Sequence, residues 1–281
     1  QLEYFAGWAT KISGDAITGE PDSVSMLVRE PVGVAALISP WNFPLLLANQ
    51  KVAPALAAGC TVIVKPAEQT PLSAVVLAAI LEEAGLPPGV FNLLTGDGPS
   101  AGAPLVRHRD VDKVSFTGST EVGKQIVRES ADTLKRVSME VGGKSPAIVF
   151  ADADFDAAVD GVAKGIFWNQ GQVCGATSRL LVEESIKDDF VAALTERAAS
   201  FVLGHGLDPA TTMGPVISQE QRDRVAGYVS LALDEGARVA GRGVRPARAD
   251  LAGGWFHEPV VLDDVTMSMR VAQEEIFGPV L

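Results

Sequence analysis

Residues 113–123 read Lys-Val-Ser-Phe-Thr-Gly-Ser-Thr-Glu-Val-Gly, and this stretch decides the fold. A short apolar strand ends at Phe116, and a Gly-Ser-Thr turn leads from it into a helix. Such a turn gathers backbone N–H groups and the positive end of a helix dipole at one spot, which suits a phosphate. Ser119 adds a hydroxyl donor, while Gly118 and Gly123 allow close approach of the backbone. Many α/β turns share this pattern and bind nothing, so it predicts a nucleotide site only together with other motifs.

On both sides of this turn, short β-branched runs alternate with Ala- and Leu-rich stretches. The alternation predicts an α/β protein with a parallel, Rossmann-like sheet and, from about Gly142, a second α/β domain. Pro54 is expected to interrupt the first helix of the sheet. We expect strands at 34–39, 61–65, 91–95, 113–116, 147–150, 179–183, 238–240 and 256–262, and helices at 45–58, 71–84, 100–106, 120–130, 155–168, 186–201 and 219–235. Residues 12–30 predict a two-stranded arm outside the main sheet.

A second candidate for nucleotide binding is the segment Lys65–Glu68, which follows a predicted strand at the edge where open α/β sheets bind ligands. Glu68 suits a ribose diol, and its charge would repel a 2′-phosphate, which favours NAD over NADP. A solvated charge pair in a loop explains these residues equally well. The glycine-rich segment Gly96–Gly102 has its third glycine one position late, and Asp97 would repel phosphate, so we expect an ordinary turn there.

The chain has two cysteines, which differ in their surroundings. Cys60 precedes an apolar strand and is expected to be a small buried hydrophobic residue. Cys174 lies in a loop of Gly, Gln, Asn, Thr and Ser, which can expose the thiol and leave its backbone N–H available. This context favours a reactive thiol over a structural one.

Two polar residues could complete a site for acyl chemistry through a thioester. Glu140 follows a strand-like stretch and precedes two glycines that make room for a ligand, so it is a candidate general base. Asn42, between Trp41 and a Phe43-Pro44 turn, could direct its amide at a developing oxyanion. Taken alone, a glutamate is more often a solvated carboxylate, and an asparagine before a turn more often caps backbone groups. A thiol, a base and an amide beside a dinucleotide site together indicate oxidation of an aldehyde.

Composition excludes several classes of partner. A net charge of −12 argues against nucleic acid and anionic membranes, which need clustered Lys and Arg. No apolar run approaches the ~18 residues of a membrane span, and the histidines and cysteines show no zinc-ligand spacing, so we expect no metal.

Two cysteines fit a reducing compartment, and we expect a cytoplasmic protein. The chain opens on Gln1 and stops after an apolar run at Leu281, so we expect it to be part of a longer protein.

Six phrases in order resemble the NAD(P)-dependent aldehyde dehydrogenase superfamily. The stretches 167–186 and 266–281 look most like its betaine-aldehyde and aminoaldehyde branch. The phrases are Pro40–Pro44, Lys65–Glu68, Phe116–Gly123, Met139–Lys144, Gln170–Cys174 and Glu274–Pro279.

The resemblance implies a role for each matched residue. Cys174 would attack the aldehyde to give a thiohemiacetal, and the Asn42 amide would hold the oxyanion. After hydride transfer to NAD, Glu140 would activate water to hydrolyse the thioester. Phe43 and Trp168 would line the substrate pocket, where aromatic rings box a cationic group in the betaine-aldehyde branch. The residues implied in cofactor binding are Trp41, Lys65, Glu68, Gly118, Ser119, Gly123, Val141, Glu275 and Phe277.

The resemblance also implies a domain organisation, with residues 1–11 ending an N-terminal helix and 12–30 forming an oligomerisation arm. The NAD-binding domain would cover 31–142 and the catalytic domain 143–281, both partial. We expect the full-length protein to be a homodimer or homotetramer that acts on a small aldehyde, and the isolated chain to have little activity.

Three other functions remain open at this point. A CoA-acylating relative would pass the acyl group to a thiol, but that reaction needs no base such as Glu140. A non-redox Cys hydrolase would leave Lys65, Ser119 and Glu275 without a role. A catalytically silent structural protein would have no use for an intact Cys174.

Overall fold

The computed structural model describes residues 1–19, 21–244 and 251–281. Residue 20, within the predicted arm, and residues 245–250, within the predicted catalytic domain, lie outside the described residues. The chain forms two compact units, Gln1–Val141 and Gly142–Leu281. Each unit is described by itself.

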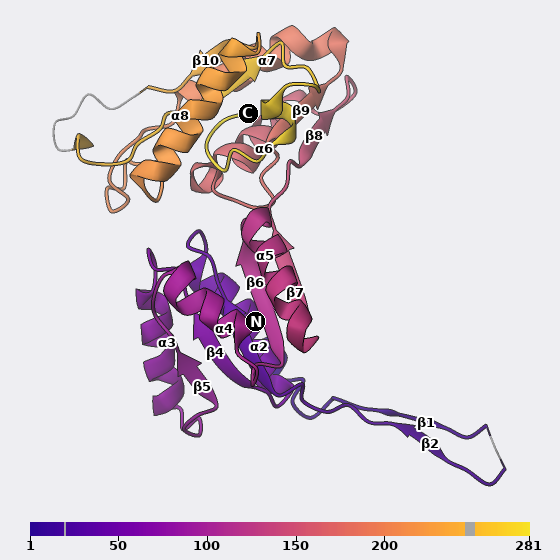
Figure 1. Cartoon of the computed structure of the whole chain (residues 1–281). Coiled ribbons are helices and arrows are strands. Elements are labelled where there is room, and N and C mark those ends of the chain that lie inside the picture. Colours follow the sequence, from indigo (N-terminus) through magenta and orange to yellow (C-terminus); the bar gives the residue numbers. More distant parts are fainter. Residues whose placement is uncertain (20, 245–250) are drawn as a thin grey trace. The chain divides into compact units, whose positions relative to one another are not determined.

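The first unit is built on a five-stranded parallel sheet of order β5-β4-β3-β6-β7 (Figure 1). Since β3 lies between β4 and β6, the chain runs outward in one direction from β3 to β5 and then returns to the other side of β3. This reversal makes a topological switch point between β3 and β6. The strands are β3 (Val34–Ile38), β4 (Thr61–Lys65), β5 (Phe91–Leu93), β6 (Lys113–Gly118) and β7 (Arg136–Val141).

Helices cover both faces of this sheet. On one face Ala35, Leu37 and Val62 pack against Val52 of α2. On the other, Ala36 and Val114 belong to a cluster completed by α4 and α5. The predicted α/β class with a parallel sheet is therefore confirmed. The helices are α1 (Leu2–Ala6), α2 (Pro44–Ala57), α3 (Leu72–Glu83), α4 (Ala103–Arg107) and α5 (Thr120–Ser130), and a helical turn at Gly98–Gly102 precedes α4.

The expected interruption at Pro54 is wrong, because α2 runs unbroken from Pro44 to Ala57. Pro54 lies in the last turn of the helix, where one missing N–H removes a single hydrogen bond. At the other end, Pro44 occupies the first turn, where its fixed φ suits a helix start. The start of α2 is thereby fixed directly after the Asn42 loop.

A two-stranded antiparallel ribbon stands outside the main sheet, as the sequence predicted. Its strands, β1 (Asp15–Ile17) and β2 (Ser25–Leu27), have only exposed residues. Ile17, Met26 and Leu27 are among them, and each is at least half exposed. Figure 1 shows this ribbon extending as a long hairpin.

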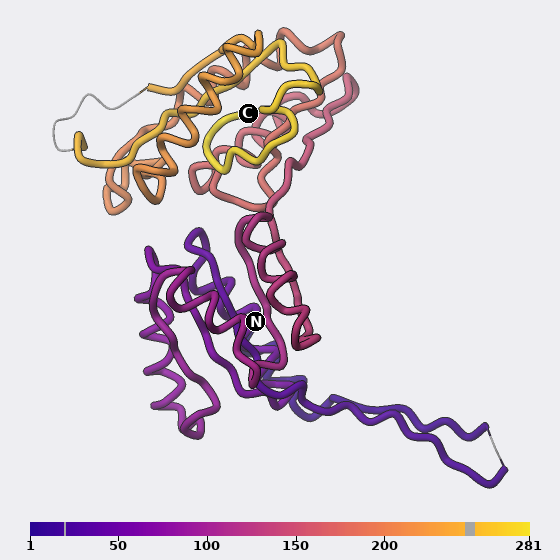
Figure 2. The backbone as a smooth tube through the Cα atoms, viewed as in Figure 1, coloured from indigo at the N-terminus to yellow at the C-terminus, as the bar shows by residue number. Residues whose placement is uncertain are grey.

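The second unit combines two small sheets with a helical core. Strands β8 (Pro146–Val149) and β9 (Arg179–Val182) pair in parallel, and β10 (Arg238–Arg242) and β11 (Val260–Asp263) pair antiparallel. Phe167, Phe190 and Leu194 lie at the centre of its largest apolar cluster in the described residues. Figure 2 traces the C-terminal segment through this unit in yellow. The helices are α6 (Phe155–Phe167), α7 (Lys187–Ala199), α8 (Gln219–Asp234) and α9 (Arg270–Gln273).

Most boundaries in this unit differ from the expected ones by one or two residues, and the largest difference is at β11. The strand expected at 256–262 begins only at Val260, directly after Pro259, whose missing N–H cannot join a ladder. The helix expected from residue 186 begins at Lys187, after a short 3-10 turn at Glu184–Ile186. Each helix in the described part of the chain is too short or too polar to be a candidate membrane span.

Candidate active site

The predicted site residues of the first unit gather at one edge of the sheet. Trp41, Asn42 and Phe43 follow β3, and Lys65 ends β4. Gly118 ends β6 and Ser119 follows it, while Glu140 and Val141 end β7. Because the strands are parallel, all of these residues lie at their carboxyl ends, and the β3 and β6 loops flank the switch point.

The turn after β6 is organised by Ser119. This residue is the N-cap of α5, and its Oγ accepts a hydrogen bond from the N–H of Val122 at 3.3 Å. The first turn of α5 therefore presents its positive end at the carboxyl edge of the sheet. The sequence predicted that the glycines here admit a ligand, and the structure shows that each also has a close neighbour within the unit. A β-carbon at Gly118 would overlap the Phe116 ring, and one at Gly123 would lie 2.9 Å from the Val141 side chain.

Lys65 is not part of a solvated pair, since only 3% of it is exposed. Its Nζ lies 3.4 Å from Oε2 of Glu68, whose side chain is about half exposed. The Lys65 charge also contributes to a lowered pKa of Asp97, after hydrogen bonds from Ser100. Asp97 caps the helical turn Gly98–Gly102, so the glycine-rich segment is a capped turn, as expected. A buried cation beside an exposed carboxylate is thus held at the end of β4.

Glu140 has a neighbour that sequence reasoning missed. Glu140 is the register partner of Thr117, and Thr117 Oγ1 accepts a hydrogen bond of 2.7 Å from the buried Nζ of Lys51 on α2. Burial lowers the pKa of Lys51, and the negative charge of Glu140 opposes that shift. The sequence signal was a lone lysine among Leu47, Ala48 and Val52 at helical spacing, where an apolar residue would be ordinary.

In the second unit, Cys174 lies exposed at a tight turn. The N–H of Ala176 donates to the carbonyl of Val173 at 3.0 Å, which closes a turn with Cys174 and Gly175 at its centre. The preceding segment is held in an unusual conformation, because Asn169, Gln170 and Gly171 all have positive φ. Cys60, by contrast, is buried, as predicted.

Two contacts fix the loop before Cys174. The buried Gln172 accepts a hydrogen bond of 3.0 Å from the N–H of Ile217, which lies just ahead of α8. Gly171 packs directly on the backbone of Gly278 and Pro279, so that a β-carbon at Gly171 would overlap the Gly278 carbonyl. The loop that carries Cys174 is therefore packed against the loop that carries Glu275 and Phe277.

We expect Gly171→Ala to destabilise the protein by about 2–4 kcal/mol, because the methyl group needs both a positive φ and a displaced backbone. Urea unfolding measures the loss, and the labelling rate of the Cys174 thiol should change with it. The matched control is Gly175→Ala, beside the same cysteine, where a β-carbon would meet nothing within 4 Å. Equal stability of the two variants would contradict the expected packing.

Glu275 lies next to the start of the second unit. The N–H of Gly143 donates to its Oε1 at 3.4 Å, and a β-carbon at Gly142 would overlap its carboxylate. The sequence analysis expected the glycines after Glu140 to leave room for a ligand. At Gly142 that space holds the Glu275 carboxylate. Lys144 is mostly buried here, and burial and the charge of Arg179 lower its pKa to about 8, against an opposing effect of Glu275.

The free energy of unfolding should rise with pH over the range in which Lys144 titrates. Its folded-state pKa of about 8 lies below the ordinary value of 10.5, so between these values the unfolded chain binds more protons. The cost of burying the charged amine is present in full below about pH 8 and is relieved as pH rises toward 10.5. Urea unfolding of wild type and Lys144→Met at a series of pH values measures this, and the rise should be smaller in the variant. An identical pH dependence in both would contradict the assignment.

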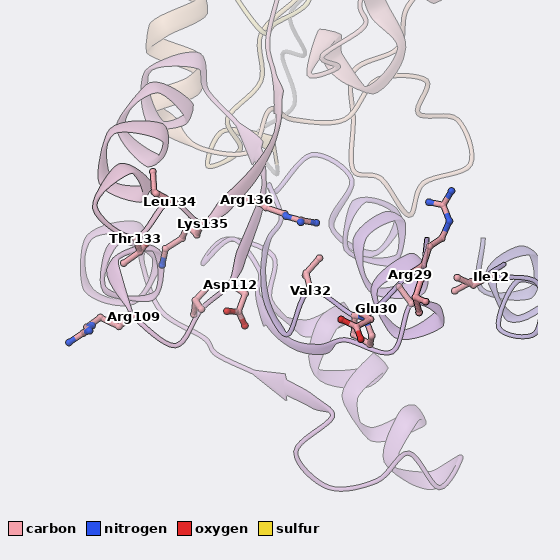
Figure 3. A pocket seen from close by; sticks show the side chains of 14 residues that line it. Ile12, Arg29, Glu30, Val32, Arg109, Asp112, Thr133, Leu134, Lys135 and Arg136 are labelled. Atoms are coloured by element: carbon pink, nitrogen blue, oxygen red, sulfur yellow. The ribbon is translucent and has the colours of Figure 1, made fainter. Parts of the chain in front are cut away.

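The first unit also contains a cavity of about 760 Å³ at the opposite, amino-terminal edge of the sheet (Figure 3). Asp112 and Arg136, at the starts of β6 and β7, line it together with Arg29 and Glu30 from the base of the ribbon. None of the predicted site residues lines it. Across the described residues, no group of three or more His, Cys, Asp or Glu side chains is arranged to hold a metal ion.

Comparison with known proteins gives one consistent result. The aldehyde dehydrogenase family profile matches residues 1–281. The chain is 50% identical to aldehyde dehydrogenase, cytosolic 1, of Mus musculus, over 99% of this chain and 55% of that protein. It is 47% identical to betaine aldehyde dehydrogenase of Bacillus subtilis strain 168, over 100% of this chain and 57% of that protein.

A solved structure shows the same fold. Betaine aldehyde dehydrogenase of Staphylococcus aureus, crystallised with NAD+, matches with a TM-score of 0.96 and 48% identity, over 99% of this chain and 55% of that one. The chain thus spans about half the length of the curated relatives that it matches. The fold implied by the sequence motifs is confirmed. From its motifs, its fold and these matches, the chain belongs to the aldehyde dehydrogenase family.

Proposed function

We propose that the full-length protein oxidises an aldehyde to a carboxylic acid with NAD, using Cys174 as nucleophile and Glu140 as base. The observation that carries the proposal is the exposed Cys174 thiol on a turn held by internal packing, in a chain of this family. Two relatives are named aldehyde dehydrogenases, and a related structure was crystallised with NAD+.

The residues at the carboxyl edge fit a dinucleotide. The positive end of α5 and Ser119 suit the pyrophosphate, and the buried Lys65 with Glu68 suits the adenine ribose. We assign Trp41, Gly118, Gly123 and Val141 to the same site, and Glu275 with Phe277 to the nicotinamide end. When bound, NAD accepts a hydride from the substrate carbon. The Glu68 carboxylate would repel a 2′-phosphate, so NAD is preferred over NADP.

Cys174 supplies the bond-forming electrons. Its thiolate adds to the aldehyde carbon, a C–S bond forms, and the carbonyl oxygen becomes an oxyanion. We assign the Asn42 amide and the backbone N–H of Cys174 as donors to that oxygen. The turn bond closes between Ala176 and Val173, so it does not use the Cys174 N–H.

Once the substrate carbon has given up its hydride, the oxyanion collapses to a carbonyl group and leaves a thioester on Cys174. Glu140 then accepts a proton from water, the resulting hydroxide adds to the thioester carbon, and the C–S bond breaks to release the acid and Cys174. The buried amine of Lys51 lies in the same unit, and the charges of Lys51 and Glu140 attract each other. A base for water is what distinguishes hydrolysis from transfer to CoA, which is the alternative fate of the acyl group.

For the substrate we propose an aldehyde with a cationic group, such as betaine aldehyde or an aminoaldehyde. The aromatic rings of Phe43 and Trp168 suit an alkylammonium group. Trp168 is 57% exposed at the start of the nucleophile loop, so its ring is accessible.

We propose further that residues 31–142 act as the NAD-binding domain, residues 143–281 as the catalytic domain, and residues 1–11 as the end of a helix of the longer chain. The ribbon within 12–30 would join subunits into a homodimer or homotetramer in the cytoplasm. Exposed Ile17, Met26 and Leu27 on unpaired strand edges support an interface there.

The test is formation of NADH by the full-length protein with betaine aldehyde, 4-aminobutanal, benzaldehyde and a short alkanal. We expect turnover with NAD above that with NADP, and the cationic aldehydes to rank first. Little turnover is expected from the isolated 281-residue chain. A preference for benzaldehyde or the alkanal would reject the cationic substrate, and failure to bind NAD would reject the dehydrogenase itself.

A further inference from the structure

The backbone of the segment Glu275–Gly278 adopts a conformation that is unfavourable for one of its own residues. Phe277 has a φ of 61°, in the left-handed region that is unfavourable for a residue with a side chain. Such a conformation persists only where the surroundings impose it. The contacts that impose it come from α8.

Two side chains of α8 bind three successive carbonyl oxygens of this segment. Arg224 Nη2 donates to the carbonyl of Glu275 at 2.6 Å, and Arg224 Nε to that of Ile276 at 3.4 Å. Gln221 Nε2 donates to the carbonyl of Phe277 at 2.8 Å and to that of Ile276 at 3.4 Å. Gln221 and Arg224 are three positions apart, so they project from the same face of the helix.

Apolar contacts also hold the segment against α8. Ile276 is buried in a cluster with Val225 and Val229 of α8. A β-carbon at Gly278 would overlap the Val225 side chain, so the backbone at Gly278 lies directly on the helix. The segment therefore lies between α8 on one side and, through Gly278, the Gly171 backbone of the nucleophile loop on the other.

The position of Arg224 is itself fixed. Its guanidinium carbon lies 5.1 Å from the centre of the Tyr228 ring. The Tyr228 hydroxyl donates to Oε2 of Glu274 at 2.7 Å, and Arg270 donates to both carboxylate oxygens of Glu274. These bonds, from Arg270 first and then Tyr228, lower the pKa of Glu274 to about 2, so this anchor stays ionised at neutral pH.

We propose that Arg224 is a positioning residue, which acts through the backbone of Glu275 and Ile276 to hold the Glu275 carboxylate where the cofactor binds. This inference rests on the proposed function, because it takes Glu275 as a ligand of the cofactor. Arg224 suits the role better than a shorter donor, because its planar guanidinium reaches two neighbouring carbonyls at once.

The first test needs no cofactor. In the full-length protein, Arg224→Met should accelerate amide hydrogen exchange at Phe277, Gly278 and their neighbours, because the segment loses its charged donor. Arg224→Lys should restore part of the protection. The matched control is Arg222→Met on the same helix, since Arg222 pairs with Asp223 and stacks on Trp255 rather than on the segment. Unchanged exchange in Arg224→Met, or the same change in Arg222→Met, would overturn the proposal.

The second test is a double-mutant cycle on NAD binding. Loss of a hydrogen bond from a charged group should weaken NAD about tenfold or more in Arg224→Met. If Arg224 acts through Glu275, the double variant with Glu275→Ala should bind NAD no more weakly than Glu275→Ala alone. Additive losses would mean that Arg224 contacts the cofactor independently and would overturn the positioning role. Failure of the wild type to bind NAD would instead refute the proposed function, while the exchange test would still stand.

Discussion

Cys174→Ala is expected to abolish aldehyde oxidation by the full-length protein, with a fall in kcat of about 10⁴-fold or more, because the proposed covalent intermediate forms on its thiol. NADH formation under saturating aldehyde measures the loss. NAD binding and the circular dichroism spectrum should stay unchanged, since Cys174 is exposed on a turn and belongs to none of the buried apolar clusters of the described residues.

The control for this experiment is present in the chain. Cys60 is the other cysteine, only 6% exposed, and Cys60→Ala should retain turnover. Loss of activity in both variants would point to misfolding rather than chemistry. Full turnover in Cys174→Ala would refute the covalent mechanism.

Glu140→Gln is expected to separate the two halves of the reaction. The glutamine cannot accept a proton from water, so hydrolysis should slow by about 10²–10⁴-fold. Acylation does not need this base, so one equivalent of NADH per subunit should still form in a rapid burst. Mass spectrometry of the intact protein should then show the acyl group on Cys174.

Glu129→Gln serves as the comparison, since Glu129 lies near the far end of α5 and binds Arg107. It should turn over like the wild type. If Glu140→Gln kept a full steady-state rate that rose further with CoA, the CoA-acylating alternative would replace hydrolysis.

Local patterns in the sequence predicted the sheet well. The strand Thr61–Lys65 was placed residue for residue, because β-branched runs bounded by Gly and Pro are strong local signals. The prediction at Pro54 was wrong, because the sequence does not show that α2 ends only three residues later. Ser119 was expected to donate to a ligand, and in the structure its hydroxyl accepts the capping bond from Val122.

The supporting residues of the site could not be predicted in the same way. Lys51 meets Thr117 across 66 positions, and Arg224 meets Glu275 across 51. Such contacts depend on how helices pack on sheets and loops, which no short motif encodes. The same holds for Gly142, whose missing side chain makes room for Glu275.

The packing of Gly171 on Gly278 also has a consequence for synthesis on the ribosome. The segment that holds the nucleophile loop is translated about a hundred residues after the loop itself, which at 5–20 residues per second is a delay of roughly 5–20 s. During that interval the nascent chain carries Cys174 without the support of Gly278. The backbone at Gly171 then lacks the contact that fixes it, so the loop that carries Cys174 should become ordered only late in synthesis.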